Sequence, residues 1–458
     1  MKDYPVKKNQ RIIVSIIDLT HEGMGVAKVD GYPLFIENSL PGEEVEVLVV
    51  KVGNKFGFAK VEKWLTESPD RQPIEHIDLL RTGIAPLSHL SYEKQLEFKQ
   101  EQVQKVMKKI AKMPEVPVYE TLGMDEPSGY RNKAQIPVRR VDGELTTGFY
   151  RKNSHQIIPI EDFYIQDPDI DKAIVTIRNI LRRFDVRAYD EESHKGMLRH
   201  IIVRRGHYTH EIMVILVTRK EKFFKGELIA ETINKEIPEV VSVIQNINEE
   251  KTNVILGKEN RVLFGKDHMI DQLLGHTFRI SPQSFYQVNT PQAEVLYQTA
   301  IDFADLKKSD VVIDAYSGIG TIGISLADKV KDVYGVEVTP EAIIDAQINA
   351  EKNHVENAHY QTGKAEVVMK KWHERGIKPT VIIVDPPRKG LAESFIQSAA
   401  EMSPEKVVYI SCNPATLARD VKLFQELGYK TEKVQPVDLF PQSYHVETVT
   451  LLSKIENN

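Results

Sequence analysis

Short apolar runs separated by turn-forming residues occupy the first part of the chain. Between about Gln10 and Trp64, the segments RIIVSIIDL, PLFIENSLPGE, EVEVLVVKV and GFAKVEKWL each have the length of a strand, and the glycine-rich stretch HEGMGVAKVDG lies among them. Several short strands with turn signals between them are typical of a small β-barrel. The sequence ESPDRQP, which is rich in turn formers, then predicts a linker.

A long amphipathic helix is predicted after this linker, over residues 92–113. Its apolar positions Leu96, Val103, Met107 and Ile110 recur at helical spacing. A helix with one apolar stripe buries that stripe against a partner. We therefore expect this helix to pack on a larger unit.

Strands such as IIVRRG and IMVILVTR alternate with helices such as KGELIAETINKEI from about Pro117 to Phe264, which suggests an α+β domain. Basic residues form three clusters in this region. Ordinary surface ion pairs are the better explanation for any one cluster, whereas three clusters in one domain favour contact with nucleic-acid phosphates. The clusters are Arg131, Lys133, Arg139 and Arg140, then Arg178, Arg182 and Arg183, then Arg199, Arg204 and Arg205.

After about Gly275 the pattern changes to a strand, a turn and a helix, repeated, as in VVIDAYSGIG followed by TIGISLADKV. Continuous apolar strands that alternate with helices indicate a parallel, doubly wound sheet, in which ligands bind at the carboxyl ends of the strands. We therefore expect a multidomain α/β protein of three parts. These are a barrel over 1–66, an α+β domain with the linker helix over 67–275, and a Rossmann-like domain over 276–458.

A glycine loop follows the first strand of the last domain, in Asp314-Ala-Tyr-Ser-Gly318-Ile-Gly320-Thr-Ile-Gly323. Glycines allow a ligand to approach the backbone, and free amide groups at the start of a helix face that ligand. Such a loop alone is a weak signal. Glu337 ends the next strand and could accept hydrogen bonds from ribose hydroxyls. Together they indicate an adenosine-type ligand, and both NAD and S-adenosylmethionine remain open.

The tetrapeptide Asp385-Pro-Pro-Arg388 ends the strand TVIIV. Two prolines stiffen the backbone there and withhold two N–H donors, although a plain turn would also explain them. In amino-methylating enzymes an aromatic residue follows a comparable Asp-Pro-Pro and stacks on the base. Arg388 in that place argues against methylation of an exocyclic amine.

Cys412, the only cysteine, ends the strand KVVYI. One cysteine excludes an intramolecular disulfide and a thiolate cluster, and a lone cysteine is more often a small buried hydrophobe than a nucleophile. Its position at the sheet edge of Asp314, Glu337 and Asp385 favours chemistry. A thiolate that adds to C6 of uracil would make C5 nucleophilic enough to take a methyl group.

The C5 proton must then leave, which requires a nearby base. The segment LFPQSYHVETV offers Glu447, with His445 two residues earlier on the same side of a strand. A carboxylate in a partly dry pocket has a raised pKa suited to this task. The ordinary alternative is that Glu447 is a surface acid on an edge strand.

Six ordered motifs resemble those of the RNA uracil-5-methyltransferase family. They are SPQSFYQVN, DAYSGIGTIG, VYGVE, VDPPRKG, YISCNPATLARD and FPQSYHVETV, and the resemblance covers nearly the whole chain. It is strongest to bacterial 23S ribosomal RNA enzymes with an N-terminal TRAM domain, an OB-like barrel that binds RNA, and in particular to the Gram-positive branch that modifies two ribosomal uridines.

The resemblance implies a class I methyltransferase domain that uses S-adenosylmethionine, together with roles for individual residues. Cys412 would be the nucleophile and Glu447 the proton acceptor. Arg131 and Lys133, in YRNKAQIPV, would contact RNA. S-adenosylmethionine would contact Gln287, Tyr316, Glu337 and Asp385, with Gly318 and Gly320 shaping the loop.

One departure from the family concerns an iron–sulfur cluster that many relatives hold on four cysteines. The matching places here hold His76, Thr82, Ala85 and Phe163. We therefore expect no cluster and no metal, and we expect the methyl-transfer reaction to be unaffected.

Composition adds little beyond these motifs. The 458 residues exceed one compact core, and the net charge of −6 is weak evidence against a surface covered in phosphate-binding groups. Neither an apolar run of membrane-spanning length nor a signal-peptide stretch is present, so we expect a cytoplasmic protein. We also expect a monomer.

The sequence thus predicts a methyltransferase that makes 5-methyluridine in 23S ribosomal RNA. Four alternatives remain open. They are the same chemistry on a transfer RNA uridine, RNA cytosine-5 methylation, a dinucleotide-dependent oxidoreductase, and a non-catalytic RNA-binding ribosome-assembly factor.

Overall fold

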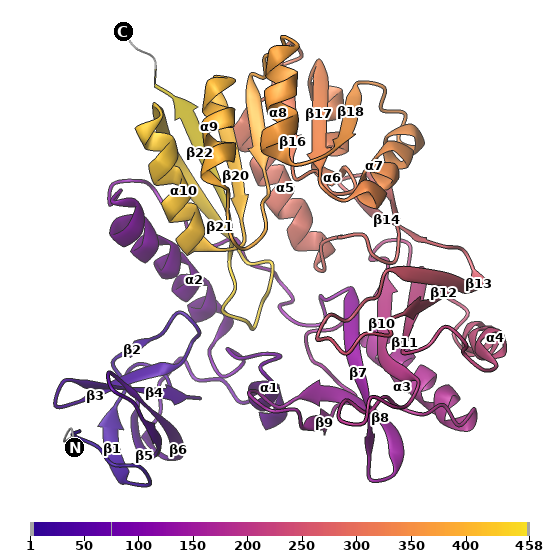
Figure 1. Ribbon diagram of the computed structural model, residues 1–458. Helices are drawn as coiled ribbons and strands as arrows, with labels where there is room; N and C mark the ends of the chain where they lie inside the picture. Colours follow the sequence, from indigo (N-terminus) through magenta and orange to yellow (C-terminus); the bar gives the residue numbers. More distant parts are fainter. Residues whose placement is uncertain (1–3, 75, 456–458) are drawn as a thin grey trace.

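An N-terminal β-barrel begins the computed structural model, which describes residues 4–74 and 76–455 (Figure 1). Six strands form its sheet, in the order β1-β5-β6-β4-β3-β2. Alternate residues point inward, so Val45, Val47 and Val49 are fully buried. The strands are β1 (Arg11–Ser15), β2 (Asp18–Leu19), β3 (Gly25–Val29), β4 (Tyr32–Glu37), β5 (Glu44–Val52) and β6 (Gly57–Thr66).

The linker holds the short helix α1 (Ile77–Thr82) and the long helix α2 (Tyr92–Val106), which continues as a π-helical turn, Met107–Ala111. The expected helix is confirmed, and it packs beside α10 of the last domain (Figure 1). The prediction of which residues form its buried apolar stripe is only partly correct. Val103 and Met107 are buried, but Ile110 is 40% exposed, and the buried face instead includes Gln95 and Lys99.

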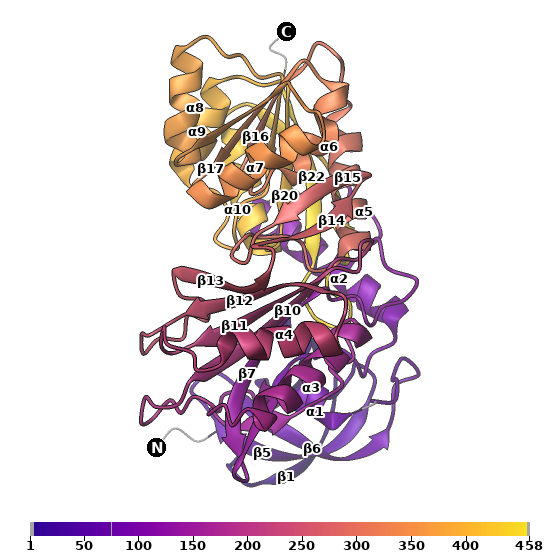
Figure 2. The same cartoon turned by 90° about the vertical axis from the view of Figure 1, so that its right-hand side faces the viewer.

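The central domain is built on a seven-stranded sheet in the order β13-β12-β11-β10-β7-β8-β9, in which only β11 and β12 run parallel. Helices α3 (Pro168–Arg183) and α4 (Gly226–Glu236) lie together on one face (Figure 2). The α+β expectation is therefore confirmed. The strands are β7 (Lys133–Val141), β8 (Glu144–Tyr150), β9 (Ile157–Pro159), β10 (Leu198–Arg205), β11 (Ile212–Thr218), β12 (Val240–Ile247) and β13 (Glu259–Gly265).

The other face of the central sheet packs against the hairpin of β14 (Met269–Leu273) and β15 (His276–Ile280). Met213 and Ile215 of the sheet share a buried core with Phe278 of the hairpin. That core continues into α5 (Thr290–Ala304) and the C-terminal sheet. The central and C-terminal domains are therefore joined by packed apolar side chains.

The C-terminal sheet has the order β18-β17-β16-β19-β20-β22-β21. Its first five members run parallel, as the doubly wound expectation requires, and β22 and β21 are antiparallel. The strands are β16 (Val311–Ala315), β17 (Asp332–Glu337), β18 (Ala358–Thr362), β19 (Val381–Val384), β20 (Lys406–Ser411), β21 (Tyr429–Val437) and β22 (Glu447–Lys454). The helices are α6 (Thr321–Leu326), a 3-10 turn (Ala327–Lys329), α7 (Pro340–Lys352), α8 (Ala365–Glu374), α9 (Glu393–Glu401) and α10 (Pro414–Glu426).

The strand order reverses beside β16, because the chain passes from β16 outward to β17 and β18 and then returns to β19 on the opposite side. Such a reversal opens a crevice at the carboxyl ends of the strands, where doubly wound sheets bind ligands. Among the described residues, no helix combines the length and the apolar composition needed to cross a membrane.

Candidate active site

A cavity of about 750 Å³ opens at the carboxyl ends of the parallel strands. It brings together seven of the eight residues that the sequence predicted for catalysis and cofactor binding. Gly320 does not line it. The seven are Gln287, Tyr316, Gly318, Glu337, Asp385, Cys412 and Glu447.

The glycine loop forms one wall of the cavity. Tyr316, Gly318 and Gly320 all have positive φ, at 66°, 53° and 85°, so the loop turns back sharply before α6 begins. Gly320 is the N-cap residue of α6, and a Cβ built on it would lie 2.7 Å from the hydroxyl oxygen of Tyr360. The loop therefore packs against Tyr360 at Gly320, where there is no room for a larger side chain.

Two carboxylates fix this loop. Glu337 accepts hydrogen bonds from the N–H groups of Gly318 (3.3 Å), Val338 (2.7 Å) and Thr339 (3.0 Å). Asp314 accepts the N–H of Gly323 at 2.9 Å and lies buried beneath the loop, where burial raises its pKa to about 7. Asp314 therefore positions the loop and does not line the cavity.

The cavity fits the adenosine-type ligand that the sequence predicted. The buried Ser317 hydroxyl lines it and has no hydrogen-bond partner among the described residues, so it is available to a ligand. Apolar side chains of Ile322, Val336 and Val338 form a surface on which a nucleobase can pack. Glu337 also lines the cavity, and its contact with a ribose stays a prediction.

The turn that carries Cys412 lies between β20 and α10 and also lines the cavity. Asn413 caps α10 by accepting the N–H of Ala415 at 3.0 Å. Its amide also donates to the Arg388 carbonyl at 3.1 Å, which ties the cysteine turn to the Asp-Pro-Pro-Arg loop. Burial, with the carboxylates of Glu447 and Asp385 nearby, raises the pKa of the half-buried Cys412 thiol to about 12.

Glu447 lies beside Cys412 because β22 pairs with β20, with Thr448 opposite Ser411. The strand runs between β20 and β21, and Glu447 is 5% exposed, so the reading as a surface acid on an edge strand is wrong. Burial, with Asp385 nearby, raises the pKa of Glu447 to about 8. Burial also raises the pKa of Asp385 to about 7.

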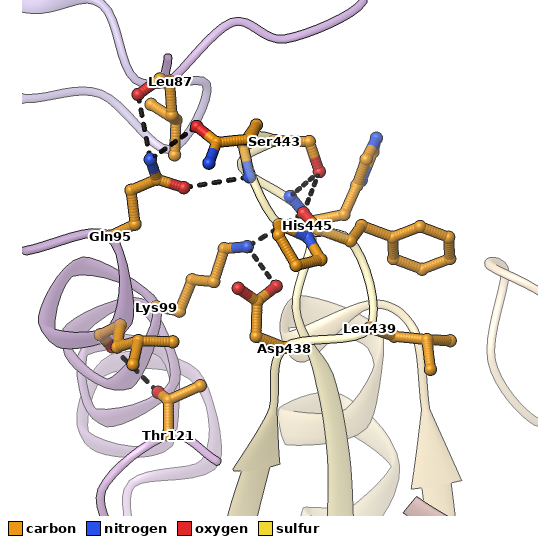
Figure 3. A network of polar contacts seen from close by, with 12 residues as sticks. Leu87, Gln95, Lys99, Thr121, Asp438, Leu439, Ser443 and His445 are labelled. Carbon is orange, nitrogen blue, oxygen red and sulfur yellow. Dashed lines mark hydrogen bonds and ion pairs between the residues drawn. The ribbon is translucent and has the colours of Figure 1, made fainter. Parts of the chain in front are cut away.

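A loop of residues 438–446 joins β21 to β22 and is fixed by helix α2 (Figure 3). Lys99 donates to Asp438 at 2.5 Å and to the Phe440 carbonyl at 3.1 Å. Gln95 donates to the Gln442 side chain at 3.0 Å and accepts the Gln442 N–H at 2.9 Å. The loop in turn places Phe440 and His445 on the cavity wall.

His445 is a neutral group in this wall. Burial and the nearby cations Arg388, Lys99 and Arg131 lower its pKa to about 4. Sequence reasoning noted His445 only as a neighbour of Glu447 and did not find Lys99 or Asp438. One signal in the sequence could have revealed them. Gln95 and Lys99 are four residues apart and lie on the same helix face as the apolar Val103, which indicates that both polar side chains are buried.

The basic clusters of the central domain are engaged mostly in contacts within the protein, so ordinary ion pairs and carbonyl contacts, the explanation preferred for any one cluster, account for seven of the ten residues. Arg199 and Arg204 donate to backbone carbonyls. The others pair with carboxylates from separate segments: Arg139 with Glu191, Arg178 with Glu161, Arg182 with Glu144, Arg183 with Glu236, and Arg205 with Asp167 and Asp169.

Arg131 and Lys133 differ from those arginines. Neither has a carboxylate within 4 Å in the described part of the chain, and the Arg131 guanidinium donates to the Lys133 carbonyl at 3.1 Å. Burial, with the guanidinium groups of Arg204 and Arg131, lowers the pKa of Lys133 to about 7. Both lie outside the large cavity.

Of the four positions that the family resemblance matches to cluster cysteines, Thr82, Ala85 and Phe163 are buried, and His76 is exposed. Ala85 belongs to a small core with Leu79, Tyr130 and Ile165, and Phe163 is buried in the main core of the central domain. Thr82 is buried and donates to the Asp78 carbonyl at 2.6 Å. Within residues 4–74 and 76–455, no group of three or more His, Cys, Asp or Glu side chains could hold a metal ion.

Comparison with known proteins places this geometry in context. A family model described as tRNA (uracil-5-)-methyltransferase matches residues 91–455, and a TRAM domain model matches residues 5–61. A Streptococcus mutans protein named as an uncharacterized RNA methyltransferase is 57% identical over 449 residues, covering 98% of this chain and 100% of its own. A Streptococcus agalactiae protein of the same description is 56% identical over 447 residues, covering 98% and 99%.

A solved structure is similar over nearly the full length. The Pyrococcus abyssi tRNA (uracil-54, C5)-methyltransferase in complex with S-adenosyl-L-homocysteine has a TM-score of 0.77 and 26% sequence identity, covering 96% of this chain and 99% of that one.

Proposed function

The chain belongs to the tRNA (uracil-5-)-methyltransferase family, and from this premise we propose that it methylates C5 of uridine in 23S ribosomal RNA. It is an S-adenosylmethionine-dependent RNA methyltransferase with an N-terminal TRAM domain. The observation that carries the proposal is that Cys412, Asp385 and Glu447 share one cavity with the glycine loop.

Gln287, Tyr316, Glu337 and Asp385 would hold S-adenosylmethionine, with Gly318 and Gly320 shaping its loop. When bound, this group supplies a methyl group on a positively charged sulfur. The Ser317 hydroxyl and the apolar surface of Ile322 and Val336 support this assignment, because they match the polar and apolar parts of an adenosine.

Cys412 begins the reaction by adding its sulfur to C6 of uracil, which breaks the C5–C6 double bond and moves negative charge to O4. Because burial raises the pKa of the free thiol to about 12, the thiol must lose its proton to solvent as the uracil ring binds. The nearby Arg388 guanidinium offsets part of the rise that burial causes in the pKa of Cys412 and of Glu447. Arg388 therefore favours the charged forms that the reaction needs.

C5 then takes the methyl group, and Glu447 removes the remaining C5 proton. The electrons of that C–H bond restore the C5–C6 double bond as the bond from C6 to sulfur breaks, and Cys412 is released. A pKa of about 8 suits this proton transfer, since the most effective general base titrates near the working pH. The target nucleotide would be flipped out of its fold to reach the cavity.

Ribosomal RNA as the substrate is supported by the resemblance of the six motifs to the 23S branch. Transfer RNA is the second candidate, favoured by the similarity to the Pyrococcus abyssi enzyme, whose name gives tRNA uridine 54. Arg131 and Lys133, which have no carboxylate partner among residues 4–74 and 76–455, are the proposed RNA contacts. We propose a cytoplasmic monomer with domains at 1–66, 67–275 and 276–458.

Mapping of 5-methyluridine in the RNA of cells that lack this protein tests the proposal. Loss at one or two 23S sites is the expected result. Loss confined to transfer RNA would establish the second candidate, and loss of 5-methylcytidine alone would contradict the uracil mechanism. Unchanged 5-methyluridine in every RNA would contradict the enzymatic proposal.

A further inference from the structure

Three phenylalanine rings gather on the outer face of the N-terminal barrel. Phe35 of β4 and Phe58 of β6 are register partners, and their ring centroids lie 5.9 Å apart. Phe56, in the turn before β6, lies 5.1 Å from Phe35 and 5.7 Å from Phe58. Phe56 is 42% exposed. We call these three residues the phenylalanine cluster.

Two tyrosines hold the turn that presents Phe56. Tyr32 donates to the Gly53 carbonyl at 2.9 Å and accepts the Gly53 N–H at 3.1 Å. Tyr4 donates to the Asn54 side chain at 2.8 Å. An exposed ring on a fixed turn loses little conformational entropy when it binds a partner. The turn is therefore suited to presenting an aromatic surface.

Positive charge surrounds the phenylalanine cluster. Lys51 is a register partner of Phe58, Lys60 lies two residues further along β6, and Lys55 lies in the turn. All three are exposed, and none has a carboxylate within 4 Å in the described part of the chain. Two acids on the same face are paired, Glu37 with Lys152 at 3.3 Å and Glu62 with Arg11 at 2.6 Å.

The face also borders the rest of the protein. Glu37 lies two residues after Phe35 on the same side of β4, and its partner Lys152 belongs to the central domain. A chain lying on the phenylalanine cluster could therefore continue onto the central domain. Aromatic rings ringed by lysines bind single-stranded nucleic acid by stacking bases and pairing with phosphates.

We propose that the phenylalanine cluster stacks one or two unpaired nucleotides of the substrate RNA, on a strand that flanks the target uridine. The proposal rests on the proposed function, because it assigns a second contact to the same RNA. Lys51, Lys55 and Lys60 pair with the phosphates of that strand. The cluster contributes to RNA binding and leaves the methyl-transfer step itself unchanged.

The double variant Phe56→Ser/Phe58→Thr of the full-length protein tests this surface. We expect the KM for RNA to rise about tenfold or more, in the range that stacking of one or two bases provides, while kcat at saturating RNA stays the same. The matched control is Ile13→Thr, since Ile13 is 58% exposed on β1 of the same barrel and outside the cluster. Circular dichroism checks that each barrel remains folded.

A second readout reports stacking directly. A single-stranded RNA carrying 2-aminopurine should lose fluorescence on binding to the wild-type protein and much less on binding to Phe56→Ser. The proposed stacking role would be refuted by equal quenching with both proteins. It would also be refuted if the KM of Phe56→Ser/Phe58→Thr were no higher than that of Ile13→Thr. A wild-type protein that methylates no RNA would instead contradict the proposed function, so the two failures are distinguishable.

Discussion

The Lys99 ammonium lies 2.5 Å from the Asp438 carboxylate, and both side chains are fully buried. The pair joins helix α2 to the loop that leads to Glu447, across 339 residues of sequence. Burial lowers the pKa of Lys99, and the charge of Asp438 opposes that effect. Tyr92 also donates to Asp438 at 2.9 Å. The carboxylate is thus held from two positions of the same helix.

Lys99→Met should destabilise the protein by roughly 3–5 kcal/mol, because it leaves the Asp438 charge buried without its cation. Urea unfolding measures this change. The double variant Lys99→Met/Asp438→Leu should recover much of the stability, since it removes both charges. Lys94→Met is the matched control on α2, because Lys94 pairs with Glu97 at the surface and should change stability by less than about 1 kcal/mol. Equal losses in the two lysine variants would contradict this account.

Cys412→Ala should abolish transfer of labelled methyl groups to RNA, since no other thiol is present. Binding of S-adenosylhomocysteine, measured by calorimetry, should persist because the glycine loop and Glu337 are unchanged. Tight binding of NAD with no binding of S-adenosylhomocysteine would refute the cofactor assignment. Methyl transfer by Cys412→Ala would refute the assignment of Cys412 as the nucleophile.

The sequence correctly placed several cavity residues at one edge of the C-terminal sheet, and the reason is physical. Cys412, Asp385 and Glu337 each follow an apolar strand, and parallel strands end at one edge of a sheet, so local periodicity was enough to bring them together. Six motifs in the family's order then identified the chemistry. None of these inferences needed knowledge of contacts between distant segments.

The parts that sequence reasoning missed all depend on such contacts. Arg205 looked available for phosphate until the fold placed Asp167 beside it at 2.8 Å. Lys99 occupies a helix position whose burial requires a partner 339 residues away. Glu447 looked as though it could lie on an edge strand, because nothing local shows that β21 covers β22. Pairing across long separations is not encoded in local patterns.

Gly320→Ala should cost more stability than an alanine at another left-handed glycine. An alanine at φ 85° bears backbone strain of about 1–2 kcal/mol, and here its Cβ would also meet the Tyr360 hydroxyl at 2.7 Å. Gly376→Ala isolates the strain alone, since Gly376 has φ 83° with no atom within 4 Å of its Cβ. Thermal unfolding compares the two. We also expect weaker S-adenosylhomocysteine binding only in Gly320→Ala, and equal effects of both would contradict the supporting role of Gly320.

Glu447→Gln should stop the reaction after the methyl group has been transferred. Without a base, the C5 proton stays, so the bond from Cys412 to C6 cannot break. A protein–RNA adduct should then persist on a denaturing gel, and Glu447→Gln/Cys412→Ala should form none. Rapid product release by Glu447→Gln would assign the proton transfer to another group.

The same substitution should stabilise the protein at high pH. The folded pKa of Glu447, about 8, lies above its ordinary value of 4.5, so the folded state holds a proton that the unfolded state releases between these values. Ionisation of Glu447 therefore lowers the free energy of unfolding progressively as pH rises from about 4.5 to 8. Above about pH 8 this loss of stability has reached its full size and no longer changes with pH. Because Gln stays neutral, Glu447→Gln should gain on the order of a few kcal/mol over wild type at pH 9 and nothing near pH 4. Urea unfolding at both pH values measures this difference, and a gain of equal size at pH 4 would show that the effect comes from packing and not from charge.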